Sequence, residues 1–112
     1  MPGNFSTEVS ATDQGTVIHV RGDVDMATAG RLRDAIEPHM GPEQVIILDL
    51  SEVEFMDSSC MHVLVQARGQ LTENGGSLVL RNPSSLAHRV LTAAGATDLL
   101  ETDARDHSAD SN

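Results

Sequence analysis

The alternation of apolar and polar positions predicts two short strands near the start of the chain. They cover residues 5–10 and 16–21, and the second places Val17, His19 and Arg21 on a wetter face. The residues Asp, Gln and Gly form a turn signal between the two segments. We therefore expect the strands to pair in an antiparallel hairpin.

A strand, a loop and a helix are predicted in the middle of the chain. Residues 45–50 are almost entirely apolar, which is typical of a strand covered on both faces. A short polar turn follows, and an amphipathic pattern then predicts a helix over residues 58–73. The predicted core-facing residues of this helix are Cys60, Val63, Leu64, Ala67 and Leu71. The sequence Asn-Gly-Gly ends the helix and turns the chain.

Two further helices are predicted, one on each side of this unit. The first follows a loop over residues 22–25, with Asp25 as its N-cap. Its core-facing residues are Ala29, Leu32, Ile36 and Met40. The other begins with Asn82 as the cap and Pro83 at the first helical position, and it ends at Gly95. Its core-facing residues are Leu86, Val90, Leu91 and Ala94.

Strands over residues 77–81 and 99–102 complete the predicted elements. The order is β-β-α-β-α-β-α, followed by the short last strand. Because strands alternate with helices, we expect an α/β fold with a small mixed β-sheet covered by helices. One domain is predicted over residues 5–102, between a flexible N-terminus (residues 1–4) and a disordered acidic tail (residues 103–112).

The composition is acidic and poor in aromatic residues. The chain has 17 acidic and 7 basic residues, a net charge of −10 and two Phe as its only aromatic residues. This disfavours nucleic acid and anionic membranes as partners and fits a partner with a basic patch. The spacing of the histidines predicts no metal site, and the absence of a glycine-rich nucleotide loop predicts no cofactor. With one cysteine, no signal peptide and no long apolar run, we expect a cytoplasmic protein without membrane insertion.

Asp57, Ser58 and Ser59 lie at the start of the second predicted helix. Free N–H groups and the helix dipole make such a position favourable for an anion or a phosphate. A serine at this position can be a helix cap, a nucleophile or a phosphorylation site, and the spacing alone favours the cap. A serine hydrolase would need G-x-S-x-G, whereas this segment reads M-D-S-S-C, so we do not expect an enzyme.

The segment LDLSEVEFMDSSCMHVLVQA closely resembles the signature of anti-sigma factor antagonists of the STAS family (sulfate transporter and anti-sigma antagonist). Three further stretches resemble the family and occur in its order. They are RGDVDMATA, NGGSLVL and NPSSLAHRVLTAAGATDLL. The resemblance extends from about residue 5 to residue 102. It implies a STAS-like fold and a regulatory protein that acts by binding other proteins.

The resemblance also implies a switch at Ser58. In this family the serine directly after the motif aspartate is phosphorylated by a partner, an anti-sigma factor that is a serine kinase. The unphosphorylated antagonist binds this partner and releases a sigma factor, phosphorylation prevents binding, and a PP2C-type phosphatase restores it. Cys60 stands where the family has glycine. Other members serve as accessory subunits of membrane transporters or lipid-transport ABC complexes, and this is the alternative function.

Six residues are candidates for contact with the anti-sigma factor: Asp23, Asp57, Ser59, Met61, Val65 and Arg68. Asp23 lies on a loop that the family fold would bring close to Ser58. Met61, Val65 and Arg68 share a second face of the predicted helix, as a docking stripe would. Structural alternatives remain open: the two residues that flank Ser58 could cap the helix, and Met61 and Val65 could be buried under a neighbouring loop.

Overall fold

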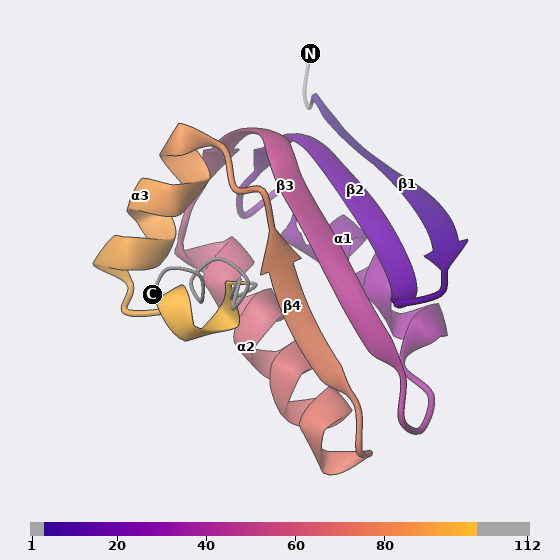
Figure 1. Ribbon diagram of the computed structural model, residues 1–112. Helices are drawn as coiled ribbons and strands as arrows, with labels where there is room; N and C mark the ends of the chain where they lie inside the picture. The colour runs from indigo at the N-terminus through magenta and orange to yellow at the C-terminus, as the bar shows by residue number, and fades with distance from the viewer. Residues whose placement is uncertain (1–3, 101–112) are drawn as a thin grey trace, which may run out of the picture.

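Four strands and three α-helices make up residues 4–100, the part of the chain that the computed structural model describes (Figure 1). The strands are β1 (Phe5–Thr12), β2 (Gly15–Val24), β3 (Val45–Met56) and β4 (Ser77–Arg81). The helices are α1 (Ala29–Ile36), α2 (Ser58–Glu73) and α3 (Ser85–Ala93), with short 3-10 helices η1 (Glu37–His39) and η2 (Thr97–Leu99). The predicted order β-β-α-β-α-β-α is confirmed.

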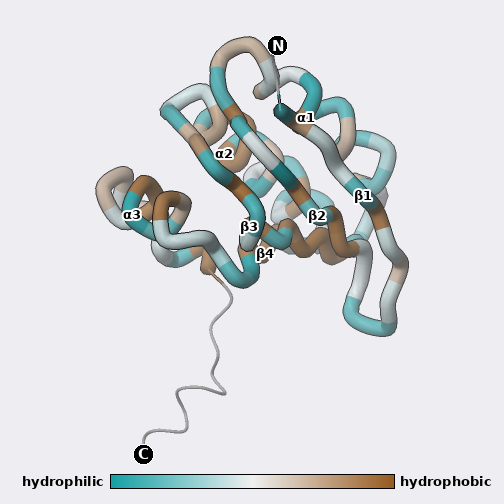
Figure 2. Tube along the Cα trace, turned by 90° about the horizontal axis from the view of Figure 1, so that it is seen from above, coloured by the Kyte–Doolittle hydropathy of each residue, from teal (hydrophilic) through white to brown (hydrophobic). Residues whose placement is uncertain are grey.

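The strands form one mixed sheet in the order β1-β2-β3-β4. The β1–β2 hairpin is antiparallel, as predicted, whereas β2, β3 and β4 run parallel to one another. Helices α1 and α2 connect these parallel strands and lie side by side on one face of the sheet (Figure 1, Figure 2). The predicted fold class, a small mixed sheet covered by helices, is therefore confirmed.

The main core lies between the sheet and the layer formed by α1 and α2. Ile18, Leu48 and Leu80 of the sheet are fully buried in it. All five residues of the core stripe predicted for α2 are buried there as well. Leu91 of α3 belongs to the same cluster. Because burial of one such side chain stabilises the fold by roughly 1.5–3 kcal/mol, this layer is the main source of stability.

The central strand is longer than predicted. β3 continues past Leu50 to Met56, so the stretch predicted as a polar turn is extended strand. β2 also continues, to Val24, and takes most of the predicted 22–25 loop into the sheet. The two strands stay paired up to Val24 and Met56, with two register shifts on the way. Val53 and Met56 are buried, and this burial keeps a largely polar stretch in the sheet.

The predicted start of α3 is wrong. Ser84 is the cap of this helix, because its hydroxyl accepts a hydrogen bond from the Ala87 amide at 3.1 Å. Asn82, the predicted cap, has a φ of +51°, a left-handed conformation that does not begin a helix. Pro83 therefore precedes the helix instead of occupying its first position.

The predicted end of α3 is correct. Gly95 follows the helix with a φ of +71°, which glycine adopts without strain. The four predicted core-facing residues differ in burial: Leu91 is buried, Leu86 and Val90 are partly buried against the core, and Ala94 is exposed. The prediction for Ala94 is therefore wrong, because it lies at the C-cap, where the helix leaves the core.

The strand predicted over residues 99–102 does not form within the described part of the chain. Only residues 99 and 100 of the predicted strand are described: Leu99 is the last residue of helix η2, and Leu100 makes an isolated parallel bridge to Leu80. Residues 1–3 and 101–112, which include the predicted acidic tail, lie outside the described residues.

A buried carboxylate connects β3 to the segment that precedes α3. Asp49 is only 7% exposed. One of its oxygens accepts hydrogen bonds from the Ser51 amide at 3.0 Å and the Ser51 hydroxyl at 2.7 Å. The other oxygen accepts from the side-chain amide of Asn82 at 3.3 Å. Burial raises the pKa of the Asp49 carboxyl, but the hydrogen bonds from Ser51 and Asn82 outweigh this and hold the pKa below its ordinary value.

We predict that Asp49→Asn lowers the free energy of unfolding at pH 7, because a neutral amide replaces a charged acceptor. A carboxylate with a lowered folded-state pKa stabilises the fold above its ordinary pKa of 3.8, and this stabilisation is lost as the pH falls through the folded pKa. In urea denaturation, the difference between wild type and variant should therefore shrink below about pH 4. A difference that does not depend on pH would contradict the role of the charge.

Candidate functional site

Ser58 is the first residue of α2, and it is exposed. The preceding residue, Asp57, is the N-cap: its carboxylate accepts a hydrogen bond from the Ser59 amide at 2.9 Å. The geometry thus gives the capping role to Asp57 and not to Ser58. Within residues 4–100 the Ser58 hydroxyl has no hydrogen-bond partner. A free hydroxyl therefore stands at the positive end of the helix dipole.

The connection from β2 to α1 adjoins the start of α2. Because β2 and β3 are parallel, their carboxyl ends lie at the same edge of the sheet. The Asp57 amide donates a hydrogen bond to the Val24 carbonyl at 3.3 Å. Asp23 is paired in register with Phe55, on the strand that leads directly to Ser58. The structure therefore brings Asp23 beside this segment.

The loop between β2 and α1 is held by hydrogen bonds among its own residues. The buried Thr28 hydroxyl donates to the Asp23 carbonyl at 2.8 Å and accepts from the Asp25 amide at 2.9 Å. The Asp25 carboxylate accepts from the amides of Ala27 at 3.0 Å and Thr28 at 3.1 Å. Asp25 thus caps this turn. The prediction that it is the N-cap of the helix is wrong, because α1 begins only at Ala29.

Two large apolar side chains that the sequence pattern did not mark are exposed on the two segments that meet at this edge of the sheet. Met26, in the β2–α1 loop, is 81% exposed, and Phe55 at the end of β3 is 45% exposed. The available sequence signals were weak: one Met among loop residues, and one Phe in an apparent turn. The surface formed by Asp23, Met26, Phe55, Asp57 and Ser58 is called the Ser58 edge below. Its exposed Met and Phe are residue types that are enriched at protein–protein interfaces.

The docking stripe predicted on α2 is only partly accessible to a partner protein. Val65 is 58% exposed, whereas Met61 is partly buried and packs against the core. Arg68 donates a hydrogen bond to the Asp98 carboxylate of η2 at 2.8 Å, so its charge is paired within the protein. Ser59 is partly buried, and its amide belongs to the N-cap of the helix. Val65 is therefore the stripe residue that a partner reaches most easily.

Cys60 is buried beneath the Ser58 edge, with 1% of its surface exposed. Burial, together with the nearby charge of Asp57, raises the pKa of its thiol to about 12. The thiol is therefore protonated at neutral pH and is a poor nucleophile. Because its side chain packs in the core stripe of α2, Cys60 does not cover Ser58.

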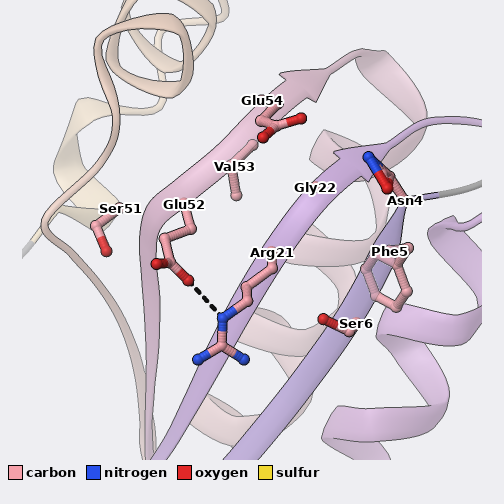
Figure 3. A pocket seen from close by; sticks show the side chains of 9 residues that line it. All are labelled: Asn4, Phe5, Ser6, Arg21, Gly22, Ser51, Glu52, Val53 and Glu54. Carbon is pink, nitrogen blue, oxygen red and sulfur yellow. Dashed lines mark hydrogen bonds and ion pairs between the residues drawn. The ribbon is translucent and has the colours of Figure 1, made fainter.

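A groove of about 690 Å³ lies on the sheet face that α1 and α2 leave open (Figure 3). In this groove the guanidinium of Arg21, on β2, donates hydrogen bonds to the carboxylate of Glu8 on β1 at 2.9 Å and to the carboxylate of Glu52 on β3. This residue therefore links three strands. In the described ranges, no group of His, Cys, Asp and Glu side chains is arranged to hold a metal ion. None of the helices between residues 4 and 100 has the length and apolar character needed to cross a membrane.

Comparison with known proteins agrees with this geometry. Residues 7–101 match the family described as "Mlab, STAS domain". The chain is 32% identical over 100 residues to the anti-sigma-B factor antagonist of Listeria monocytogenes, and the match covers 88% of each protein. A solved anti-sigma factor antagonist from Mycobacterium paratuberculosis has a TM-score of 0.72 and 29% identity, over 89% of this chain and 86% of that chain.

The Bacillus protein SpoIIAA, an anti-sigma factor antagonist, has been solved in two forms. Its unphosphorylated form has a TM-score of 0.73 and 24% identity, over 95% of this chain and 93% of that chain. Its phosphorylated form has a TM-score of 0.66, over 95% of this chain and 96% of that chain. At this level of identity the likeness shows the shared fold.

The mixed sheet with two helices on one face is the fold that this chain shares with the solved anti-sigma factor antagonists. The chain belongs to the STAS-domain family, among its anti-sigma factor antagonists. Proteins of this class are partner-switching regulators and not enzymes. The family predicted from the FMDSS segment is therefore confirmed.

We predict that Asp57→Ala lowers the free energy of unfolding by about 1 kcal/mol, because it removes the N-cap of α2. Ser58→Ala should change this free energy by less than about 0.5 kcal/mol, because the side chain is exposed and does not cap the helix. Urea denaturation followed by circular dichroism measures both values. Equal destabilisation by the two substitutions would show that Ser58 shares the capping role.

Proposed function

We propose that this protein binds an anti-sigma factor with serine kinase activity and thereby releases a sigma factor. Phosphorylation of Ser58 switches this binding off, and a PP2C-type phosphatase restores it. The observation that carries the proposal is the free, exposed hydroxyl of Ser58 at the first position of α2, next to an N-cap supplied by Asp57. The relatives from Listeria and Mycobacterium support the proposal, since both are named as anti-sigma factor antagonists. The proposed location is the cytoplasm, where sigma factors act.

A phosphate on Ser58 would change the charge of the Ser58 edge and leave the fold intact. It adds roughly −1.5 to −2 charges at neutral pH, on a surface that already carries Asp23 and Asp57. The start of α2 favours the phosphate through the positive end of the helix dipole, although the Ser59 amide is already bonded to the Asp57 carboxylate. A partner that fits closely over the neutral hydroxyl would instead meet a bulky hydrated anion. Repulsion and the cost of desolvation would then oppose docking.

The proposed docking surface extends from the Ser58 edge along α2. Met61, Val65 and Arg68 follow Ser58 at intervals of three, seven and ten residues, so they lie along one side of the helix. The contact residues that we propose on this surface are Asp23, Asp57, Ser59, Met61, Val65 and Arg68. An acidic surface with exposed apolar groups fits a partner that has basic residues around an apolar patch.

We predict that the Ser58→Ala protein keeps the anti-sigma factor and that the Ser58→Asp protein binds it at least tenfold more weakly, because a fixed negative charge imitates part of the phosphate. Capture from a lysate of the native host, quantified by mass spectrometry, measures this difference. The purified kinase with ATP should also phosphorylate the wild-type protein and leave the Ser58→Ala protein unmodified.

Ser85 offers a matched control, because it is an exposed serine at the first position of α3. Ser85→Asp adds the same charge at an equivalent helical position and should leave capture of the kinase unchanged. Equal capture of the kinase by the two Ser58 variants would contradict the switch. Capture of transporter or ABC subunits by both variants would instead support the alternative function as an accessory subunit of such a complex.

A further inference from the structure

Met26 is the most exposed of the large apolar side chains in residues 4–100. Val65, Phe55 and Val9 are exposed to a smaller extent. Single exposed apolar side chains are common on soluble proteins, so exposure by itself assigns no role to Met26. A role for Met26 follows from three further observations: the structure of its loop, its position and the charges around it.

The loop that carries Met26 is fixed from within. The polar side chains on either side of it, those of Asp25 and Thr28, make hydrogen bonds to the loop backbone. Thr28 is also buried, which anchors the loop at the start of α1. The apolar side chain of Met26 is thereby held outward by a structure that is formed before any partner arrives. A preorganised group loses less conformational entropy on binding and contributes more to affinity.

The sheet brings the loop that carries Met26 to the edge at which Ser58 lies. The pairing of β2 with β3 ends at Val24 and Met56, and the Asp57 amide continues it with a hydrogen bond to the Val24 carbonyl. Met26 lies two residues beyond the last pair on one strand, and Ser58 lies two residues beyond it on the other. Both residues therefore follow the same strand pair at one edge of the sheet, so a protein docked over this edge can reach both side chains.

The charges around Met26 indicate what kind of surface would contact it. The carboxylates of Asp23 and Asp57 belong to the same edge. The two nearest arginines along the chain are engaged elsewhere: Arg21 is bonded to glutamates of β1 and β3, and the guanidinium of Arg31 lies 5.1 Å from the centre of the Phe5 ring. The complementary surface is an apolar pocket with a basic rim.

We propose that Met26 inserts into an apolar pocket of the anti-sigma factor kinase, and that lysine or arginine residues at the rim of this pocket face Asp23 and Asp57. The inference rests on the proposed function and names the chemistry of the partner's surface. A methionine side chain is long, unbranched and polarisable, so it fills an irregular pocket well. Met26 then acts as an anchor that sets which kinase is recognised, while Ser58 sets whether binding takes place.

The test uses the purified anti-sigma factor kinase of the native host as the probe and measures affinity by calorimetry. The Met26 and Val9 variants carry Ser58→Ala, which is the parent protein, and Ser58→Asp is measured beside them. Met26→Ala should weaken binding by about 10- to 50-fold, because it removes most of a buried apolar side chain. Met26→Gln, of similar length but polar, should weaken binding comparably, and Met26→Leu should stay within about threefold. Val9→Ala is the control, because it truncates an exposed apolar residue on β1 and should leave affinity unchanged.

Thermal unfolding shows whether each variant is folded, and no change in midpoint is expected because the Met26 side chain is exposed. Met26→Ala or Met26→Gln binding within threefold of the parent would overturn the anchor. If Ser58→Asp binds weakly and Met26→Ala binds normally, the phosphorylation switch at Ser58 is supported and the role of Met26 as an anchor is overturned. If Ser58→Asp binds normally and Met26→Ala binds weakly, the anchor is supported and the switch is contradicted. Failure of the Ser58→Ala protein to bind the kinase at all would contradict both.

Discussion

The parallel pairing of β2 with β3, continued to Val24 and Met56, is the constraint on which the candidate site depends. Burial of Val53 and Met56 holds the outer half of β3 in the sheet although most of its other residues are polar and exposed. Because both strands end together, the loop that begins α1 and the start of α2 meet at one edge. Without this extension of the β2–β3 pairing, Asp23 and Ser58 would not share a surface. The proposed partner would then have no acidic edge to recognise.

At this edge the structural and the functional roles fall on different residues. Asp57 caps α2, so the hydroxyl of Ser58 contributes little to the helix and is available for modification. Cys60, at the position where the family resemblance implies glycine, lies inside the helix with its side chain in the core. The helical backbone at that position does not require glycine, which explains how the substitution fits the fold. A switch can therefore act at the surface while the elements beneath it stay in place.

The sequence predicted the parts of the structure that local patterns determine. The boundaries of α2 follow from the local cap and stop residues, its five buried residues follow from the helical spacing, and the FMDSS segment points to Ser58 as the candidate switch. Long-range contacts determined what it missed. Ser84 and Asn82 are both good caps by type, and the choice depends on bonds to β3: the Ser84 hydroxyl donates to the Val53 carbonyl at 2.8 Å, and Asn82 donates to Asp49. The exposure of Met26 depends instead on the hydrogen bonds of Asp25 and Thr28 within its own loop, which the pattern of apolar and polar residues does not show.

A phosphate on Ser58 is proposed to act locally, and a comparison of amide chemical shifts tests this most directly. The spectra needed are those of the wild-type protein and of the same protein with phosphoserine at position 58. We expect the shift changes to be confined to residues 23–28 and 55–61, around the Ser58 edge, with the remaining amides unchanged. Shift changes that extend through β1, β4 and α3 would show that the phosphate rearranges the fold, and would contradict a switch that works by local charge and shape.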